Sequence, residues 1–145
     1  MIILGDIGNT ETKICLVKDN KIIKKILLPS KGKKIHFLNK GFKGFDLIID
    51  DGSHLLSDII YSLNFFFKYL NYKGIYVIED YKFPNYFKRN KDCDELLVDQ
   101  ILVNLKEKKH FLSKVINQDN QRYLFKSIKS IKYYTILMAH MEYDE

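Results

Sequence analysis

The strongest constraint on the fold of this 145-residue chain is a central stretch in which the spacing of the apolar residues changes twice. FDLIID at 45–50 is a nearly continuous apolar run, which is typical of a strand buried on both faces. Residues 55–70 then carry apolar side chains at helical spacing, Gly74 offers a helix stop, and IYVI follows at 75–78. This order predicts two parallel strands joined by a right-handed helical crossover.

The chain before this unit is rich in β-forming residues. Residues 1–28 hold three short runs rich in isoleucine and valine, and the Lys18–Lys21 connection has the composition of a hairpin turn. Pro29–Lys34 is charged and rich in residues that interrupt regular structure. We therefore predict an N-terminal β-hairpin segment over 1–35 and a separate α/β domain over 36–145.

The chain after the central unit gives weaker patterns. Apolar residues at helical spacing predict a helix over 93–105, with acidic residues near its start and lysines near its end. The run YYTILMA predicts a final strand at 133–139, whereas the pattern at 119–130 is ambiguous.

Composition restricts the class of protein. Hydrophobic residues make up 46% of the chain, which is enough for a packed core, and no apolar run approaches the roughly 20 residues that a membrane-spanning helix needs. Two cysteines indicate neither a disulfide framework nor a zinc cluster. Because no signal-peptide core precedes Asp6, we expect a cytoplasmic protein without a membrane partner.

Positive charge is concentrated at the beginning of the chain. Residues 1–45 carry ten lysines and three acidic residues, so their net charge of +7 exceeds the +6 of the whole chain. Such an excess suits a polyanion, but arginine, which makes most specific contacts to phosphates and bases, is nearly absent. We interpret the lysines as a solvated surface and predict no specific nucleic-acid partner.

Acidic residues follow both strands of the central unit. Asp51 ends the first strand, and Glu79 and Asp80 end the second, so the three carboxylates should meet at the carboxyl edge of a parallel sheet. Hard oxygen donors of this kind suit Mg²⁺ or Ca²⁺ rather than zinc. His54, three residues after Asp51, is placed to act as a general base. The alternative is that these polar residues only cap the following helices.

The same residues carry a resemblance to a known family. FDLIIDDGSH followed by a helix and KGIYVIEDYKFPNYF resembles class I S-adenosylmethionine-dependent methyltransferases, in the branch of metal-dependent sugar O-methyltransferases and cephalosporin-hydroxylase-like proteins. The resemblance spans about 36–140 and implies a partial Rossmann-like sheet of mostly parallel strands. It also implies that Asp51, Glu79 and Asp80 bind Mg²⁺, that His54 deprotonates a hydroxyl of a sugar-containing acceptor, and that S-adenosylmethionine is the cofactor.

The glycine-rich loop and helix that should open such a methyltransferase have no counterpart at the start of the chain. MIILGDIGNTETKICLV instead resembles the first hairpin of type III pantothenate kinases, within the actin/hexokinase-like ATPase superfamily. This resemblance implies that Asp6, Gly8, Asn9 and Thr10 bind a phosphate of ATP. The alternative is an ordinary hairpin turn of small polar residues.

The sequence therefore resembles two incomplete families joined near residues 30–36, as a fusion, a deletion product or an error in the gene boundaries would produce. Three functions stay open: a metal-assisted O-methyltransferase-like protein, either active or truncated and inactive; an ATP-dependent phosphotransferase; or a non-catalytic α/β interaction domain. Sheet edges left exposed by missing strands would favour a homo-oligomer. For the methyltransferase-like function we expect a small hydroxyl compound, containing a sugar, as the acceptor.

Overall fold

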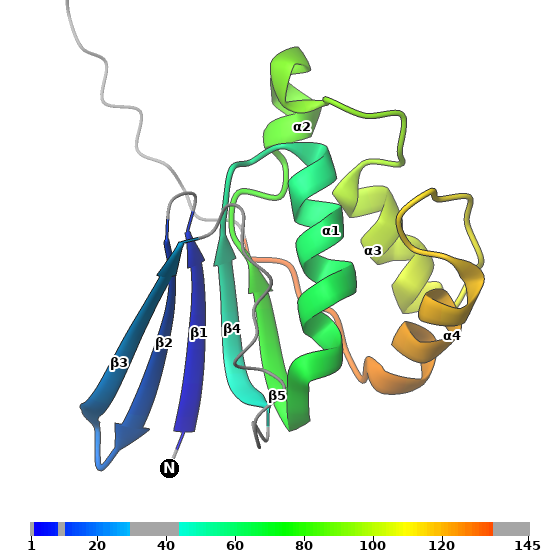
Figure 1. The fold of residues 1–145 in the computed structure, drawn as a ribbon. Helices are drawn as coiled ribbons and strands as arrows, with labels where there is room; N and C mark the ends of the chain where they lie inside the picture. Colours follow the sequence, from blue (N-terminus) through cyan, green and yellow to red (C-terminus); the bar gives the residue numbers. More distant parts are fainter. Residues whose placement is uncertain (1, 9–10, 30–43, 135–145) are drawn as a thin grey trace, which may run out of the picture.

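The fold is a single five-stranded sheet with its helices packed beside two of the strands (Figure 1). It comes from a computed structural model that describes residues 2–8, 11–29 and 44–134. The strands are β1 (Ile2–Gly8), β2 (Glu11–Lys18), β3 (Lys21–Pro29), β4 (Phe45–Asp51) and β5 (Leu70–Ile78). The helices are α1 (Leu56–Phe66), α2 (Phe83–Tyr86), α3 (Val98–Glu107) and α4 (Gln118–Ser127).

The strand order β3-β2-β1-β4-β5 corrects the prediction of a mostly parallel sheet. β1 pairs antiparallel with β2, and β2 pairs antiparallel with β3, whereas β1 with β4 and β4 with β5 are parallel. The sheet is mixed because the N-terminal strands fold as successive hairpins, which require antiparallel pairing. A Rossmann-like arrangement therefore remains a prediction, while the α/β class and the N-terminal hairpin are confirmed.

The N-terminal hairpin and the later unit share this sheet, since β1 and β4 pair directly across the predicted boundary. The boundary stretch itself lies outside the described residues, as does most of the predicted strand at 133–139. Asp19 and Asn20 both have left-handed backbones, with φ of 50° and 58°. Two such residues form the tight turn that matches the twist of a hairpin, so the predicted turn is confirmed.

The central unit follows the predicted order of strand, helix and parallel strand. Leu56, Ile59, Ile60 and Leu63 bury the predicted apolar face of α1. The helix is shorter than predicted because a 3₁₀ turn over Phe67–Tyr69 leads directly into β5.

Gly74 lies inside β5 and does not stop a helix, contrary to the sequence prediction. The register between β4 and β5 shifts between Phe45 and Leu47, so β5 is irregular beside Gly74. A Cβ atom at this position would lie 2.9 Å from the carbonyl oxygen of Asn71 and 3.0 Å from that of Phe45. The close approach of two backbones therefore explains this glycine.

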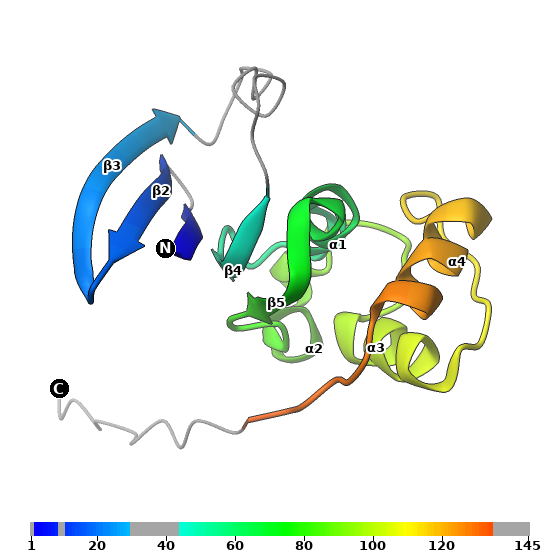
Figure 2. The same cartoon turned by 90° about the horizontal axis from the view of Figure 1, so that it is seen from below.

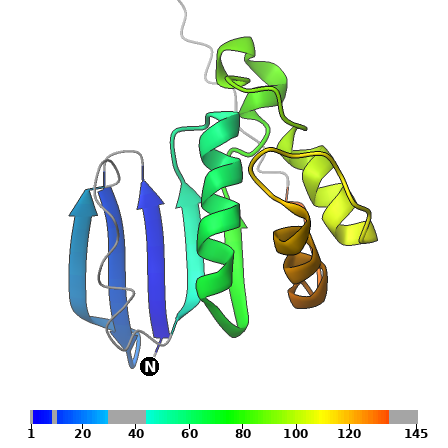
Figure 3. The same ribbon diagram turned by 45° about the vertical axis from the view of Figure 1, so that its right-hand side comes forward.

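The main core lies among the helices and the β5 side of the sheet. Its buried members come from α1, α3, α4 and the segment before α4: Leu56, Ile59, Ile60, Leu63, Val98, Ile101, Leu105, Ile116 and Leu124. Figures 2 and 3 show these helices gathered beside β4 and β5, with none over β2 and β3. No helix within the described residues is long and apolar enough to cross a lipid bilayer.

Side-chain hydrogen bonds cap the first turns of helices α3 and α4. α3 starts later than the predicted residue 93, at Val98, and the Leu97 backbone N–H donates to Oε1 of Gln100 at 3.0 Å. α4 resolves the open assignment at 119–130 in favour of a helix, and Asn117 caps it by accepting from the Asn120 N–H at 2.9 Å. Such caps satisfy N–H groups that would otherwise lack partners.

A buried amide anchors the loop between α3 and α4. The Gln121 side chain is 1% exposed, and its Oε1 accepts from the Phe111 N–H at 3.2 Å. Its Nε2 donates to the carbonyl oxygens of Phe111 and Ile116, at 2.8 Å and 2.9 Å. One side chain therefore satisfies three backbone groups of a segment without regular structure.

The variant Gln121→Met is expected to lower the free energy of unfolding by about 2 kcal/mol, because it keeps most of the side-chain volume but leaves buried backbone groups unpaired. Urea denaturation would measure the change. Gln118→Met, on the exposed start of the same helix, is the matched control and should leave stability nearly unchanged. An equal loss in the two variants would contradict the structural role of the Gln121 amide.

Candidate functional site

The candidate site lies where three neighbouring strands end at the same edge of the sheet. In the parallel register of β1 and β4, Gly8 is the partner of Asp51. β5 ends one strand further along, where Asp50 is the partner of Ile78 and the Glu79 N–H donates to the Asp50 carbonyl at 2.9 Å. The ends of β1, β4 and β5 therefore lie at one edge of the sheet, as the sequence predicted for the latter two strands.

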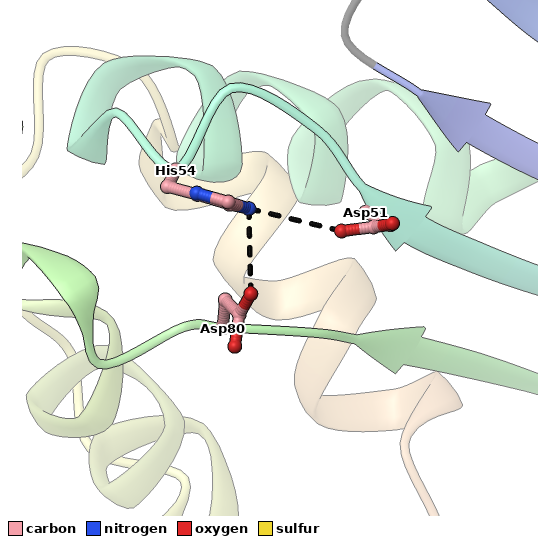
Figure 4. A group of neighbouring side chains, drawn as sticks. All are labelled: Asp51, His54 and Asp80. Atoms are coloured by element: carbon pink, nitrogen blue, oxygen red, sulfur yellow. Dashed lines mark ion pairs between the residues drawn. The ribbon is translucent and has the colours of Figure 1, made fainter. Parts of the chain in front are cut away.

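Three of the predicted site residues meet there. Nε2 of His54 lies 3.7 Å from Oδ1 of Asp51 and 3.4 Å from Oδ2 of Asp80, and Figure 4 shows the imidazole between the two carboxylates. One possible ligand atom from each residue lies within 4.8 Å of the others. Glu79 is exposed and is not a member of this group, so its assignment as a ligand remains a prediction.

Two members of the group have unusual backbone conformations. His54 and Asp80 have φ values of 58° and 49°, in the left-handed region that few residues other than glycine adopt. The Asn90 side chain donates to the His54 carbonyl at 3.1 Å, and the Phe83 ring packs 4.4 Å from the imidazole, measured between ring centroids. Backbone strain held in place by neighbouring contacts is typical of functional sites.

The donor set suits a hard divalent cation. The Asp51 and Asp80 side chains are 54% and 44% exposed, so they face one another at the surface with solvent access. Two carboxylates that share solvent ligands match the preference of Mg²⁺, which binds oxygen and keeps several waters. An imidazole is a poorer ligand for Mg²⁺, which would leave His54 available to accept a proton.

The N-terminal motif contributes to the same edge of the sheet. Asp6 of β1 pairs with Ile49 of β4, two positions before the pair of Gly8 and Asp51. The side chains of Asp6 and Asp51 therefore lie on the same face of the sheet. Strand geometry separates their Cα atoms by on the order of 8 Å. The Asp6 carboxylate accepts from Nζ of Lys13 at 3.0 Å. Asn9 and Thr10, the other predicted phosphate-binding residues, lie outside the described residues.

A buried carboxyl group lies behind the site, on the opposite face of β4. Asp50 is 3% exposed, and its Oδ2 accepts from the Tyr76 hydroxyl at 3.1 Å. Burial raises the pKa of Asp50 to about 6, although hydrogen bonds from Tyr76 and Ser62 oppose the rise and the nearby Asp51 charge adds to it. Burial of the Tyr76 hydroxyl, together with the nearby Asp50 charge, raises the pKa of Tyr76 well above its ordinary value.

Sequence reasoning assigned no role to Asp50, although strand alternation could have shown that adjacent aspartates point to opposite faces. It also missed Asn90 and Phe83, which support His54 from a segment 29 or more positions later. No local pattern marks these two residues, because their contact with His54 depends on how the chain after β5 folds back.

Comparison with known proteins gives one partial relationship. No protein-family model and no solved structure matches the chain. The type III pantothenate kinase of Pelagibacter ubique is 56% identical to it over 48 residues. The match falls in the N-terminal region of that kinase and covers 32% of this chain but only 19% of the kinase. It supports the resemblance of the N-terminal hairpin, whereas the methyltransferase resemblance remains a prediction.

Proposed function

We propose that the edge formed by β1, β4 and β5 binds Mg-ATP and transfers its γ-phosphoryl group to a small hydroxyl compound. The main support for this proposal is the pairing of Gly8 with Asp51, which puts the end of the kinase-like strand β1 beside the acidic group of the later segment. The partial identity to a pantothenate kinase supports the same choice. The match covers under a fifth of that kinase, so activity is part of the proposal.

Each residue of the site has a separate role in this proposal. Asp51 and Asp80 hold Mg²⁺, with Asp6 close enough to contribute through a water ligand; the cation supplies charge neutralisation at the phosphates. The phosphates are assigned to Gly8, Asn9 and Thr10, as the resemblance to the kinase hairpin implies. The acceptor oxygen forms a bond to the γ-phosphorus, the bond from phosphorus to the bridging oxygen of ADP breaks, and His54 takes the hydroxyl proton.

Transfer of a methyl group from S-adenosylmethionine to a hydroxyl is a second candidate. It is favoured by the gathering of Asp51, His54 and Asp80, the arrangement that the methyltransferase resemblance implies. In that reaction His54 would also accept the hydroxyl proton, beside Mg²⁺ held by the two aspartates. β1 runs directly into the antiparallel β2, where such an enzyme would carry a cofactor-binding loop and helix, and we therefore place it second.

Isothermal titration of the full chain tests the choice between the two functions. We expect Mg-ATP to bind, EDTA to abolish binding, and Asp51→Asn to weaken it at least tenfold, roughly the effect of losing one charged contact of 1.4 kcal/mol. Asp94→Asn makes the same charge change at a fully exposed position and should have no effect.

Two outcomes would contradict the proposal: ATP fails to bind in the presence of Mg²⁺, or it binds equally well to the Asp51→Asn variant. Binding of S-adenosylhomocysteine with Mg²⁺ in the first case would favour the methyltransferase function. Asp6→Asn separates the contribution of the N-terminal hairpin, since an unchanged affinity would exclude Asp6 from the site.

A further inference from the structure

A small cavity opens beside His54, outside the carboxylate group. Its volume is about 300 Å³, at the lower end of the range for small-molecule sites. The loop before α1 contributes Ser53, His54 and Leu55, and the segment that includes α2 and the following 3₁₀ turn contributes Phe83, Arg89 and Asn90. His54 is therefore shared between this cavity and the candidate metal site.

One wall of the cavity contains an incompletely paired amide. Asn90 is only 7% exposed, and its Nδ2 donates to the His54 carbonyl, which can only accept. That bond fixes the orientation of the amide, and the buried Oδ1 has no hydrogen-bond partner within the described residues. The amide therefore holds the His54 backbone in the cavity wall, while its own oxygen is enclosed by the surrounding chain.

The cavity also has a cation that suits an anionic ligand. Arg89 lines it, and its guanidinium carbon lies 5.9 Å from the centre of the Phe87 ring. Within the part of the chain that the structure describes, no carboxylate forms an ion pair with Arg89, in contrast to Arg122, which pairs with Asp119. A guanidinium at the edge of a partly apolar cavity favours a carboxylate or phosphate, which it can bind through two parallel hydrogen bonds.

We propose that this cavity is the acceptor subsite and that it selects small hydroxyl compounds carrying a carboxylate or phosphate group. Arg89 binds the anionic group, and Asn90 fixes the backbone of His54 in the cavity wall. The reacting hydroxyl then lies against the His54 side chain. The inference rests on the proposed function, because it assigns the acceptor of the same reaction.

The test titrates glycerate and glycerol 3-phosphate, as anionic probes, into the full chain at millimolar concentration without ATP. Uncharged glycerol is the control probe. Binding is followed through the NMR signals of the arginine side chains and the histidine rings. Both anionic probes should bind and shift the His54 and Arg89 signals, whereas glycerol should not. Arg89→Gln should weaken binding at least about tenfold, since a charge-assisted contact is lost.

Arg122→Gln is the matched control, because Arg89 and Arg122 are the two arginines of the chain, and it should leave probe binding unchanged. An equal effect of the two variants, binding of glycerol comparable with that of the anions, or no binding of either anion would overturn the inference. Mg-ATP titration of Arg89→Gln separates the two proposals. If Arg89→Gln binds both Mg-ATP and the anionic probes normally, the acceptor cavity is rejected. If the anionic probes bind in an Arg89-dependent way but Mg-ATP does not bind at all, the proposed function is rejected.

Discussion

Replacing His54 by asparagine should lower the rate of phosphoryl transfer by roughly 10²–10⁴-fold while leaving the affinity for Mg-ATP nearly unchanged. Asparagine is polar and tolerates a left-handed backbone, so the φ of 58° at this position does not by itself destabilise the variant. It cannot accept the acceptor proton in the way that imidazole does. The measurement is ADP release with ATP and pantothenate, which is the acceptor named for the partial relative.

A structural role for His54 would give a different pattern. If the imidazole only supports the loop through Phe83, the variant should lose thermal stability together with activity. If His54 takes the proton, the rate should fall in His54→Asn at unchanged melting temperature. A variant with the unaltered rate would exclude His54 from the chemistry.

The strand–helix–strand unit could be predicted because its signals are local. Apolar spacing indicates the alternation of β4, α1 and β5, and the carboxyl ends of parallel strands meet at one edge, which correctly predicts that Asp51 and Asp80 converge. The place of His54 follows from its position three residues after Asp51. In each case the information lies within one strand and the turn that follows it.

The remaining features depend on partners that are distant in sequence. β1 pairs with both β2 and β4, and the apolar pattern of β1 alone does not specify which neighbours it takes, so the mixed sheet could not be predicted. The support of His54 by Asn90 requires the chain after β5 to return toward the loop before α1. Asp51 and Asp80 converge as predicted, but Glu79 is not a member of their group, because adjacent residues at a strand end point in different directions.

The variant Asp50→Asn should raise the free energy of unfolding at pH 7 by about 3 kcal/mol and flatten its dependence on pH between about 4 and 6. The pKa of Asp50 rises from 3.8 to about 6 on folding, chiefly through burial, and each unit corresponds to about 1.4 kcal/mol. Because the folded-state pKa is the higher one, the stabilising contribution of Asp50 is present below pH 4 and is lost as pH rises through 6. Asparagine keeps the shape and still accepts from Tyr76, but carries no charge to bury.

Urea denaturation of the unaltered chain and of Asp50→Asn across this pH range, in EDTA so that no cation contributes, isolates the effect as a difference. Tyr76→Phe is the opposing variant: it removes a hydrogen bond that lowers the pKa of Asp50, so it should raise that pKa further and destabilise the fold most at pH 7. Hydrogen bonds from Asn71 and the Ile3 N–H lower the pKa of Asp46. The contribution of Asp46 to stability is therefore lost only when the pH falls below the ordinary pKa of an aspartate. Parallel stability curves for the unaltered chain and Asp50→Asn would show that Asp50 is solvated when ionised, and that the face of β4 behind the candidate site is open to water.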